Sequence, residues 1–382
     1  MMQVWRRTCW TGALALSLAA APPAGADDPL LDEIVSFTGI LAYLESGVPG
    51  MIIGATRDGE TAVFGFGRLS DDADAEPDGT TMFRAGSLTK AFTGAALASM
   101  VADGTVRLSD PLHDHLAWGI EVPERDGHVI RLIDLATHTS GLPREVEREP
   151  GPPDDPFRTL TAETYAAALA ADPLLFAPGT AGLYSNFAFD VLSAALADAD
   201  GRPYADLLRQ RVLDPAGLTD SVLELRPGDR DRLLQGHDFD GSPLPDVPAT
   251  PIMAGASSLY TTGDDILAWL NWHMDRFAAE NAEMRLLDHA AYVQRDGLDP
   301  VSGFDESGHM DAMGLGWVIM RPDGDRPLIL QKAGGLQGVF SYMAFSPTRG
   351  VGAFMVISEF DLAAGLAMPE TINDLIATLA PR

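Results

Sequence analysis

The sequence predicts a mixed α/β (α+β) protein whose sheet is built from both ends of the chain and whose middle is mostly helical. Near the start, two strand-like segments, 51–57 and 61–68, flank the turn dipeptide Asp58-Gly59. Strand patterns return only near the end, and helical periodicity fills the segment between. Strands at both ends with helices between them imply that the two ends assemble one sheet.

The N-terminal part contains a helix, a hairpin and an acidic loop. Apolar residues recur at near-helical spacing over 30–44, which predicts a docking helix. The Asp58-Gly59 turn predicts a two-stranded hairpin. Residues 71–79 carry acidic side chains at a spacing that faintly resembles a calcium loop, but Pro77 stands where glycine is needed and Phe83 where the closing carboxylate should be. We therefore expect a solvated loop there.

The middle of the chain is predicted to be helix and loop. Residues 87–102 are rich in Ala, Leu and Met around most of the helix circumference, which indicates a buried helix with Ser87 at its N-terminus. Further helical patterns, separated by connections rich in Pro and Gly, cover residues 162–171, 187–199, 204–212 and 264–277.

The C-terminal part returns to strands. We expect strands at 315–320, 328–332, 339–345 and 351–358, with a turn at Asp323-Gly324, and a final amphipathic helix over 372–379. The predicted organisation is a sheet domain made of residues 27–86 and 305–382, and a mostly helical domain made of residues 87–304.

The first 26 residues read as a secretory signal peptide. Arg6 and Arg7 precede an apolar run over 12–21, and small residues at Ala24 and Ala26 predict cleavage after Ala26. The run is too short to span a bilayer, although a retained anchor is the alternative reading. The sequence thus predicts a periplasmic or secreted protein without stable membrane insertion after cleavage.

Cysteine content and charge exclude several kinds of function. The single cysteine, Cys9, lies in the signal, so the mature chain has no disulfide, cysteine nucleophile or thiolate metal site. Without the signal, 24 basic residues face 55 acidic ones, a net charge of −31 against −29 for the full chain. A field of that sign repels nucleic acid and anionic membrane surfaces.

The chain contains only two lysines, Lys90 and Lys332, while arginine takes the other 24 basic positions. A lysine can lose its proton when it is buried, which arginine cannot do. Lys90 lies three residues after Ser87 at a predicted helix start, so both side chains share one face. The helix N-terminus and burial both disfavour an ammonium and favour Lys90 as a proton acceptor for Ser87.

Two further motifs accompany this pair. Tyr184-Ser185-Asn186 precedes an apolar helix, and the triplet on its own favours a structural interpretation, a buried tyrosine and a helix-capping asparagine, over a catalytic one. Lys332 ends a predicted strand and is followed by Gly334 and Gly335, whose missing side chains let a substrate lie against the strand edge. The alternative is an edge lysine that deters aggregation.

In the order S-x-x-K, Y-x-N, K-x-G, these motifs resemble the class C β-lactamase and penicillin-binding protein superfamily. The segments 83–87, 135–143, 184–190 and 314–317 also match its pattern, and the likeness runs over about residues 51–379. Segment 138–144 and Gln331-Lys332 are most similar to the AmpH-type D-alanyl-D-alanine carboxypeptidase/endopeptidase branch. The resemblance implies a β-lactamase-like/DD-peptidase fold, with an antiparallel sheet flanked by helices and the active site at the interface with the helical domain.

The resemblance also implies a role for each motif residue. Ser87 would be the acylated nucleophile, Lys90 its base or proton shuttle, and Tyr184 the group that protonates the leaving group and activates the deacylating water. Asn186 would hold Lys90 and the substrate amide, and Lys332 would supply positive potential for Tyr184 and for a substrate carboxylate. Gly334 would belong to the substrate-binding strand edge. The backbone N–H groups of Ser87 and Gly335 would form the oxyanion hole. Whether Lys90 or Tyr184 is the acylation base stays open at this point.

One position departs from the family pattern. The residue between Lys332 and Gly334 is usually Thr or Ser, and here it is Ala333, which has no hydroxyl to bond a substrate carboxylate. The loss of such a contact would weaken binding by about 1–3 kcal/mol.

Histidines complete the set of candidates. His138 lies in a family motif and is expected to be a structural, hydrogen-bonding residue. His113 and His115 flank Asp114 without a third ligand at suitable spacing, so we assign no metal, and we expect no cofactor.

The sequence therefore predicts an exported serine hydrolase that forms an acyl-enzyme and acts on small molecules, either peptidoglycan stem peptides or β-lactams. A β-lactamase or an esterase on the same scaffold is the alternative among enzymes. A penicillin-binding sensor or scaffold that does not turn over is the alternative of another class. The sequence leaves the oligomeric state open.

Overall fold

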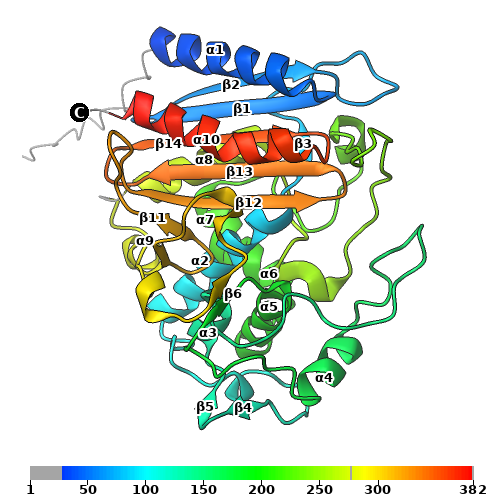
Figure 1. The fold of residues 1–382 in the computed structure, drawn as a ribbon, viewed down its shortest axis with the longest axis vertical. Coiled ribbons are helices and arrows are strands. Elements are labelled where there is room, and N and C mark those ends of the chain that lie inside the picture. The colour runs from blue at the N-terminus through cyan, green and yellow to red at the C-terminus, as the bar shows by residue number, and fades with distance from the viewer. Residues whose placement is uncertain (1–27, 276–277, 381–382) are drawn as a thin grey trace, which may run out of the picture.

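A sheet with flanking helices forms one half of the molecule, and helices with long connections form the other (Figure 1). The computed structural model describes residues 28–275 and 278–380. The predicted signal peptide, residues 1–26, lies outside these ranges. Within them, no helix has the length and apolar character needed to cross a membrane.

The main sheet has eight strands, all paired antiparallel, in the order β2-β1-β14-β13-β12-β11-β10-β8. The N-terminal strand β1 pairs with the last strand β14 from Met51 opposite Ile357 to Arg57 opposite Val351. The two ends of the chain thus build one sheet, as the sequence predicted. The strands are β1 Gly50–Arg57, β2 Glu60–Gly67, β8 Val293–Gln294, β10 Ala312–Met313, β11 Val318–Met320, β12 Ile329–Leu336, β13 Val339–Ser346 and β14 Val351–Ile357.

Both faces of this sheet are covered, which explains why the central strand β14 is buried at every residue and β13 at all but one. Helices α1 (Pro29–Ser46) and α10 (Leu362–Leu379) pack on one face, and α8 (Gly263–Met274) packs on the other (Figure 1). Alternate residues serve the two cores: Met51 and Ile53 contact the α1/α10 layer, whereas Ile52 belongs to the core shared with the helical half.

The helical half is organised around α2 (Thr89–Ala102). This helix is buried on nearly all sides and contacts α5, α6 and α9, as its uniformly apolar sequence predicts. The other helices here are α3 Leu132–Ala136, α4 Ala162–Ala170, α5 Asn186–Asp200, α6 Tyr204–Leu208, the π-helical turn η3 Arg209–Leu213, α7 Asp214–Ala216 and α9 Ala282–Asp288.

Short elements connect the two halves. The paired strands are β3 Met82–Arg84 with β7 Tyr260–Thr262, β4 Glu124–Arg125 with β5 His128–Val129, and β6 Gly182–Leu183 with β9 Val301–Ser302. The 3₁₀ turns are η1 Gly86–Leu88, η2 Leu112–Asp114, η4 Asp229–Arg232, η5 Pro251–Gly255, η6 Arg295–Gly297 and η7 Asp305–Ser307.

Several predicted boundaries were wrong. The strand expected at 315–320 begins only at Val318, because the preceding residues form a turn in which Gly314 N donates to Trp317 O and Gly316 has a φ of 82°. Conversely, β12 continues past Lys332 to Leu336, because its two glycines stay paired with β13. The last helix begins at Leu362, well before the predicted position, and contains Pro369.

The sheet also takes elements from the segment assigned to the helical domain. Helix α8 and strand β8 both lie within residues 87–304, yet α8 packs on the sheet and β8 is its last strand. Helix α8 begins at an N-cap, Thr262, whose hydroxyl accepts the Asp265 N–H.

Candidate active site

Ser87 lies in the one-turn η1 that leads into α2, directly against strand β12. Gly86 has a φ of 52°, in the left-handed region that favours glycine. A Cβ on Gly86 would lie 2.7 Å from the backbone nitrogen of Gly335. The residue before Ser87 therefore touches the strand that carries the third motif.

Gly334 is required by the same close contact. A Cβ at this position would lie 2.3 Å from the Ala85 carbonyl oxygen and 2.6 Å from Ser341 Oγ. The sequence interpretation, in which this glycine leaves room for substrate, missed this reason: the missing side chain lets the Ser87 turn pack onto the sheet. The backbone N–H groups of Ser87 and Gly335 thus come from adjoining segments, as a shared oxyanion site would need.

Lys90 is fully buried on the first turn of α2, with its nitrogen among three oxygens. Its Nζ lies 3.0 Å from Ser87 Oγ, 2.6 Å from Asn186 Oδ1 and 2.9 Å from the Ala256 carbonyl oxygen. Burial lowers the pKa of Lys90 to about 7, against the opposing charges of Asp190 and Glu145. Near neutral pH, a large share of the molecules therefore carries an unprotonated amine beside the serine hydroxyl.

The partners of Lys90 define the direction of its lone pair. A neutral amine has two hydrogens, and the Asn186 and Ala256 oxygens can only accept them. The remaining position on the nitrogen faces Ser87 Oγ. In this state the serine hydroxyl donates to the amine, which is the arrangement that proton removal from a nucleophile requires.

Asn186 is the first residue of α5, and its side chain is free for the site because Ser185 caps the helix. The Ser185 hydroxyl accepts the Ala188 N–H and donates to the Pro143 carbonyl. Asn186 Nδ2 donates to Glu145 Oε1, so its oxygen must face Lys90. The alternative interpretation of Asn186 as a helix cap was wrong, because the preceding residue, Ser185, is the N-cap of α5.

Tyr184 and Lys332 meet across the interface of the two halves. Lys332 Nζ lies 3.4 Å from Tyr184 Oη and donates at 2.9 Å to the carbonyl of Ala333. Burial lowers the pKa of Lys332 as well. Lys332 lies inside β12, but β11 pairs only with Ile329–Gln331. Beyond Gln331, no described strand pairs with that side of β12, so the strand edge is open toward the site.

His138 packs against the ring of Tyr184 and binds the backbone of the next residue. Its ring stacks on the Tyr184 ring with centroids 4.5 Å apart, and its Nδ1 accepts the Ser185 N–H at 3.0 Å. Burial holds the pKa of His138 well below its usual value, so the ring is neutral. The predicted structural, hydrogen-bonding role of His138 is confirmed.

Two carboxylates that sequence reasoning left without a role lie around Lys90. Asp190 accepts the Ala256 N–H and the Tyr165 hydroxyl, and it thereby fixes the peptide whose carbonyl holds Lys90. Burial raises the pKa of Asp190 to about 7. Glu145 holds the Asn186 amide. Asp190 is the last residue of segment 184–190 and Glu145 directly follows segment 138–144, both of which match the family pattern, but spacing alone could not show that either residue lies near Lys90.

A cavity of about 530 Å³ opens over these groups. Its floor contains Ser87, Tyr184, Asn186 and Lys332, and residues 333–335 of β12 form one wall. Helix α10 contributes an apolar rim that includes Leu362 and Leu366, both exposed. The structure thus brings all six predicted motif residues and Gly335 to a single cleft between the two halves.

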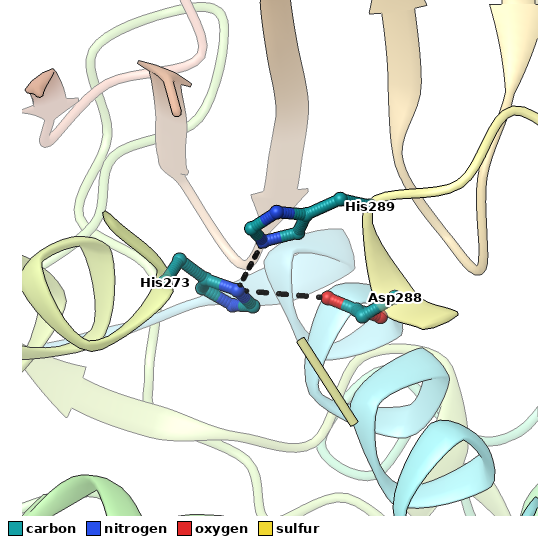
Figure 2. Close-up of side chains that lie close together, drawn as sticks. All are labelled: His273, Asp288 and His289. Atoms are coloured by element: carbon teal, nitrogen blue, oxygen red, sulfur yellow. Dashed lines mark hydrogen bonds and ion pairs between the residues drawn. The ribbon is translucent and has the colours of Figure 1, made fainter. Parts of the chain in front are cut away.

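A second cluster of titratable groups, His273, Asp288 and His289, joins α8 to the end of α9 (Figure 2). His273 Nδ1 lies 2.8 Å from His289 Nε2 and 3.7 Å from Asp288 Oδ2, which also accepts the Trp317 indole N–H. Burial lowers the pKa of His273 and raises that of Asp288 strongly, so both are neutral. Two imidazole nitrogens on one zinc lie about 3.3 Å apart, so this geometry is that of a hydrogen-bonded network.

The other histidines considered from the sequence lie elsewhere. His115 pairs with Asp110 at 3.0 Å, and the exposed His113 lies 3.2 Å from Asp114. The three residues that sequence reasoning grouped therefore do not form a common site.

A serine, a buried lysine of lowered pKa and a tyrosine paired with a second lysine, between a sheet and a helical half, define a serine hydrolase. The chain belongs to the beta-lactamase family, whose model matches residues 28–375. It is 34% identical to the D-alanyl-D-alanine-carboxypeptidase/endopeptidase AmpH of Escherichia coli K12, over 95% of this chain and 93% of that protein. It is 26% identical to a beta-lactamase of Lysobacter lactamgenus, over 96% of both chains.

Solved structures agree in fold. A beta-lactamase/D-alanine carboxypeptidase from Yersinia pestis, crystallised with citrate, superposes with a TM-score of 0.82 at 32% identity, over 92% of this chain and 99% of that chain. A class C beta-lactamase gives a TM-score of 0.77 at 19% identity, over 94% of this chain and 99% of the other, which shows the shared fold.

Proposed function

We propose that this protein is an exported D-alanyl-D-alanine carboxypeptidase/endopeptidase that cleaves peptidoglycan stem peptides through an acyl-enzyme on Ser87. The observation that carries the proposal is the placement of Lys90 Nζ, 3.0 Å from Ser87 Oγ and held by two oxygens that can only accept. The similarity to AmpH supports the substrate class, and the predicted signal peptide supports export to the periplasm.

In the proposed reaction, neutral Lys90 takes the proton of Ser87 while the serine oxygen attacks the peptide carbonyl. The backbone N–H groups of Ser87 and Gly335 stabilise the oxyanion. Tyr184 Oη gives a proton to the departing amine and then takes one from the water that hydrolyses the ester. As the ester bond breaks, Lys90 returns its proton to Ser87 Oγ, which restores both residues. The positive charge of Lys332, beside Tyr184 Oη, stabilises the negative charge that develops on that oxygen as Tyr184 gives up its proton. Asn186 and Asp190 hold Lys90 in place.

The open edge of β12 supports a peptide substrate. From Lys332 onward the strand is unpaired on its cleft side within the described chain, and residues 333–335 line the cavity. An extended peptide can add to this edge through backbone hydrogen bonds.

The test is a comparison of three substrate classes on the mature protein and on Ser87→Ala. We expect release of D-alanine from an acyl-D-Ala-D-Ala peptide to exceed turnover of nitrocefin and of a short acyl ester, and Ser87→Ala to abolish all three. Preferred turnover of nitrocefin would assign a β-lactamase, and turnover of the ester alone an esterase. Stable acylation without release would assign a penicillin-binding sensor.

A further inference from the structure

Three basic side chains surround the ring of Tyr184, and one of them, Arg144, has no assigned role. The nitrogens of Lys90 and Lys332 and the guanidinium carbon of Arg144 each lie 5.0 Å from the ring centroid. The lysines are buried and hydrogen-bonded. Arg144 is exposed, and among the described residues neither an ion pair nor a hydrogen bond engages its guanidinium.

When Lys90 is in its unprotonated form, the positive charges beside the Tyr184 ring are those of Lys332 and Arg144. Asp190 and Glu145 are the acidic residues whose charges act on Lys90, and burial raises the pKa of Asp190 to about 7. Glu145 accepts the Asn186 amide, and no ion pair between described residues joins it to Arg144. The full chain has a net charge of −29, so a locally cationic cleft stands out against an acidic surface. Such a cleft concentrates anionic ligands and repels cationic ones.

Arg144 also lies where a ligand would contact it. It lines the cavity together with Ser87, Tyr184 and Lys332. A Cβ built on Gly303 would lie 3.1 Å from Tyr184 Cβ, a tight contact, and 3.9 Å from Arg144 Nη1, an ordinary one, so Gly303, Tyr184 and Arg144 adjoin one another at this side of the cavity. A guanidinium binds a carboxylate through two parallel hydrogen bonds, which an ammonium cannot do.

Lys332 is another basic group that lines the cavity on this side of Ser87. Lys332 Nζ is shared between Tyr184 Oη and the Ala333 carbonyl, and Ala333 has no hydroxyl. We propose that Arg144 binds the carboxylate of the departing part of the substrate, on the Tyr184 side of Ser87. This inference rests on the proposed function and assigns to the cleft a carboxylate subsite centred on Arg144.

The experiment compares Arg144→Gln with Arg148→Gln, a matched change on the same loop whose guanidinium contacts Thr159 outside the cavity. The substrates are an acyl-D-Ala-D-Ala peptide and the same peptide with a C-terminal amide, on the alkaline plateau of the pH profile. We expect Arg144→Gln to lower kcat/KM for the free acid about 10- to 100-fold, mainly through KM, as expected for the loss of one charge-assisted pair. The amide should change less than about twofold, and Arg144→Lys should recover part of the loss.

An equal loss on both peptides would overturn the proposal, because Arg144 would then act only through its charge on Lys90 and Tyr184. An equal loss in Arg148→Gln would also overturn it. If the wild-type protein cleaves neither peptide, the proposed function fails, but the subsite is still tested by calorimetric binding of both peptides to Ser87→Ala. Tighter binding of the free-acid peptide than of the amide by Ser87→Ala, with this difference lost in Ser87→Ala/Arg144→Gln, would support the subsite. Equal binding of the two peptides by Ser87→Ala would refute it.

Discussion

Lys90 Nζ lies 3.0 Å from Ser87 Oγ, and the two other oxygens around that nitrogen can only accept hydrogen bonds. In the proposed reaction, the two lysines of the site therefore need different protonation states. Ser87 needs an unprotonated neighbour, and Lys90 supplies one near neutral pH because burial lowers its pKa to about 7. In the proposed reaction Lys332, by contrast, acts beside Tyr184 Oη and needs only its positive charge.

Exchange of each lysine for arginine should separate these two roles. Arginine stays protonated in proteins, so Lys90→Arg should lower the rate of acylation by about 10²- to 10⁴-fold, the usual contribution of a general base. Lys332→Arg keeps the positive charge and should cost about tenfold, as expected for one weakened charge-assisted hydrogen bond. Stopped-flow acylation by a chromogenic β-lactam measures both, and equal losses would contradict the distinction.

The pH profile should report Lys90 directly. Because the unprotonated amine is the active form, kcat/KM should rise with pH through about 7 and then level off. The charge of Asp190 raises the pKa of Lys90, so Asp190→Asn should move this acid limb to lower pH. Disappearance of the limb in Asp190→Asn would show that Asp190, whose pKa is also raised to about 7, causes it instead.

Tyr184→Phe should discriminate between leaving groups. A peptide amine must receive a proton as it departs, whereas p-nitrophenolate leaves without one. We therefore expect acylation by a peptide to fall about 10²- to 10⁴-fold, and acylation by a p-nitrophenyl ester to fall far less. Burst-phase kinetics separates acylation from hydrolysis, and equal acylation losses on the two substrates would remove the general-acid role from Tyr184.

Gly334→Ala should destabilise the protein as well as inactivate it. The added Cβ would lie 2.3 Å from the Ala85 carbonyl oxygen, so either β12 or the Ser87 turn must shift. Such overpacking costs about 1–3 kcal/mol. Gly297→Ala is the control, because no atom lies within 4 Å of its built Cβ. Thermal unfolding of the two variants measures the difference, and equal midpoints would contradict a close turn-to-strand contact.

The sequence predicted the architecture where its signals were local and strong. Asp58-Gly59 between two strand-like segments identified the β1–β2 hairpin, and the apolar circumference of residues 87–102 identified the buried α2. It failed where long-range contacts decide the structure. The extension of β12 past Lys332 depends on pairing with β13, and α8 lies on the sheet because its buried residues, such as Trp269 and Leu270, face the same core as Phe354.

In the site, too, the sequence predicted the residues that lie in local motifs and missed those placed by long-range contacts. Motif spacing identified five candidate site residues that all line or adjoin one cavity: Ser87, Lys90, Tyr184, Asn186 and Lys332. It did not identify Asp190 as the partner of the Ala256 peptide, nor Glu145 as the partner of Asn186, because those contacts join segments far apart in the chain. It also assigned no role to Arg144, whose exposure and open guanidinium are visible only in three dimensions.

The most direct test of the central claim is mass spectrometry of the intact mature protein after incubation with a penicillin and, separately, with an acyl-D-Ala-D-Ala peptide. Wild-type protein should gain the mass of one acyl group, located on the peptide that contains Ser87, and should lose it faster with the stem-peptide acyl group than with the penicilloyl group. Ser87→Ala should gain no mass with either compound. Labelling of Ser87→Ala to the same extent, or on another residue, would contradict the assignment of Ser87 as the nucleophile.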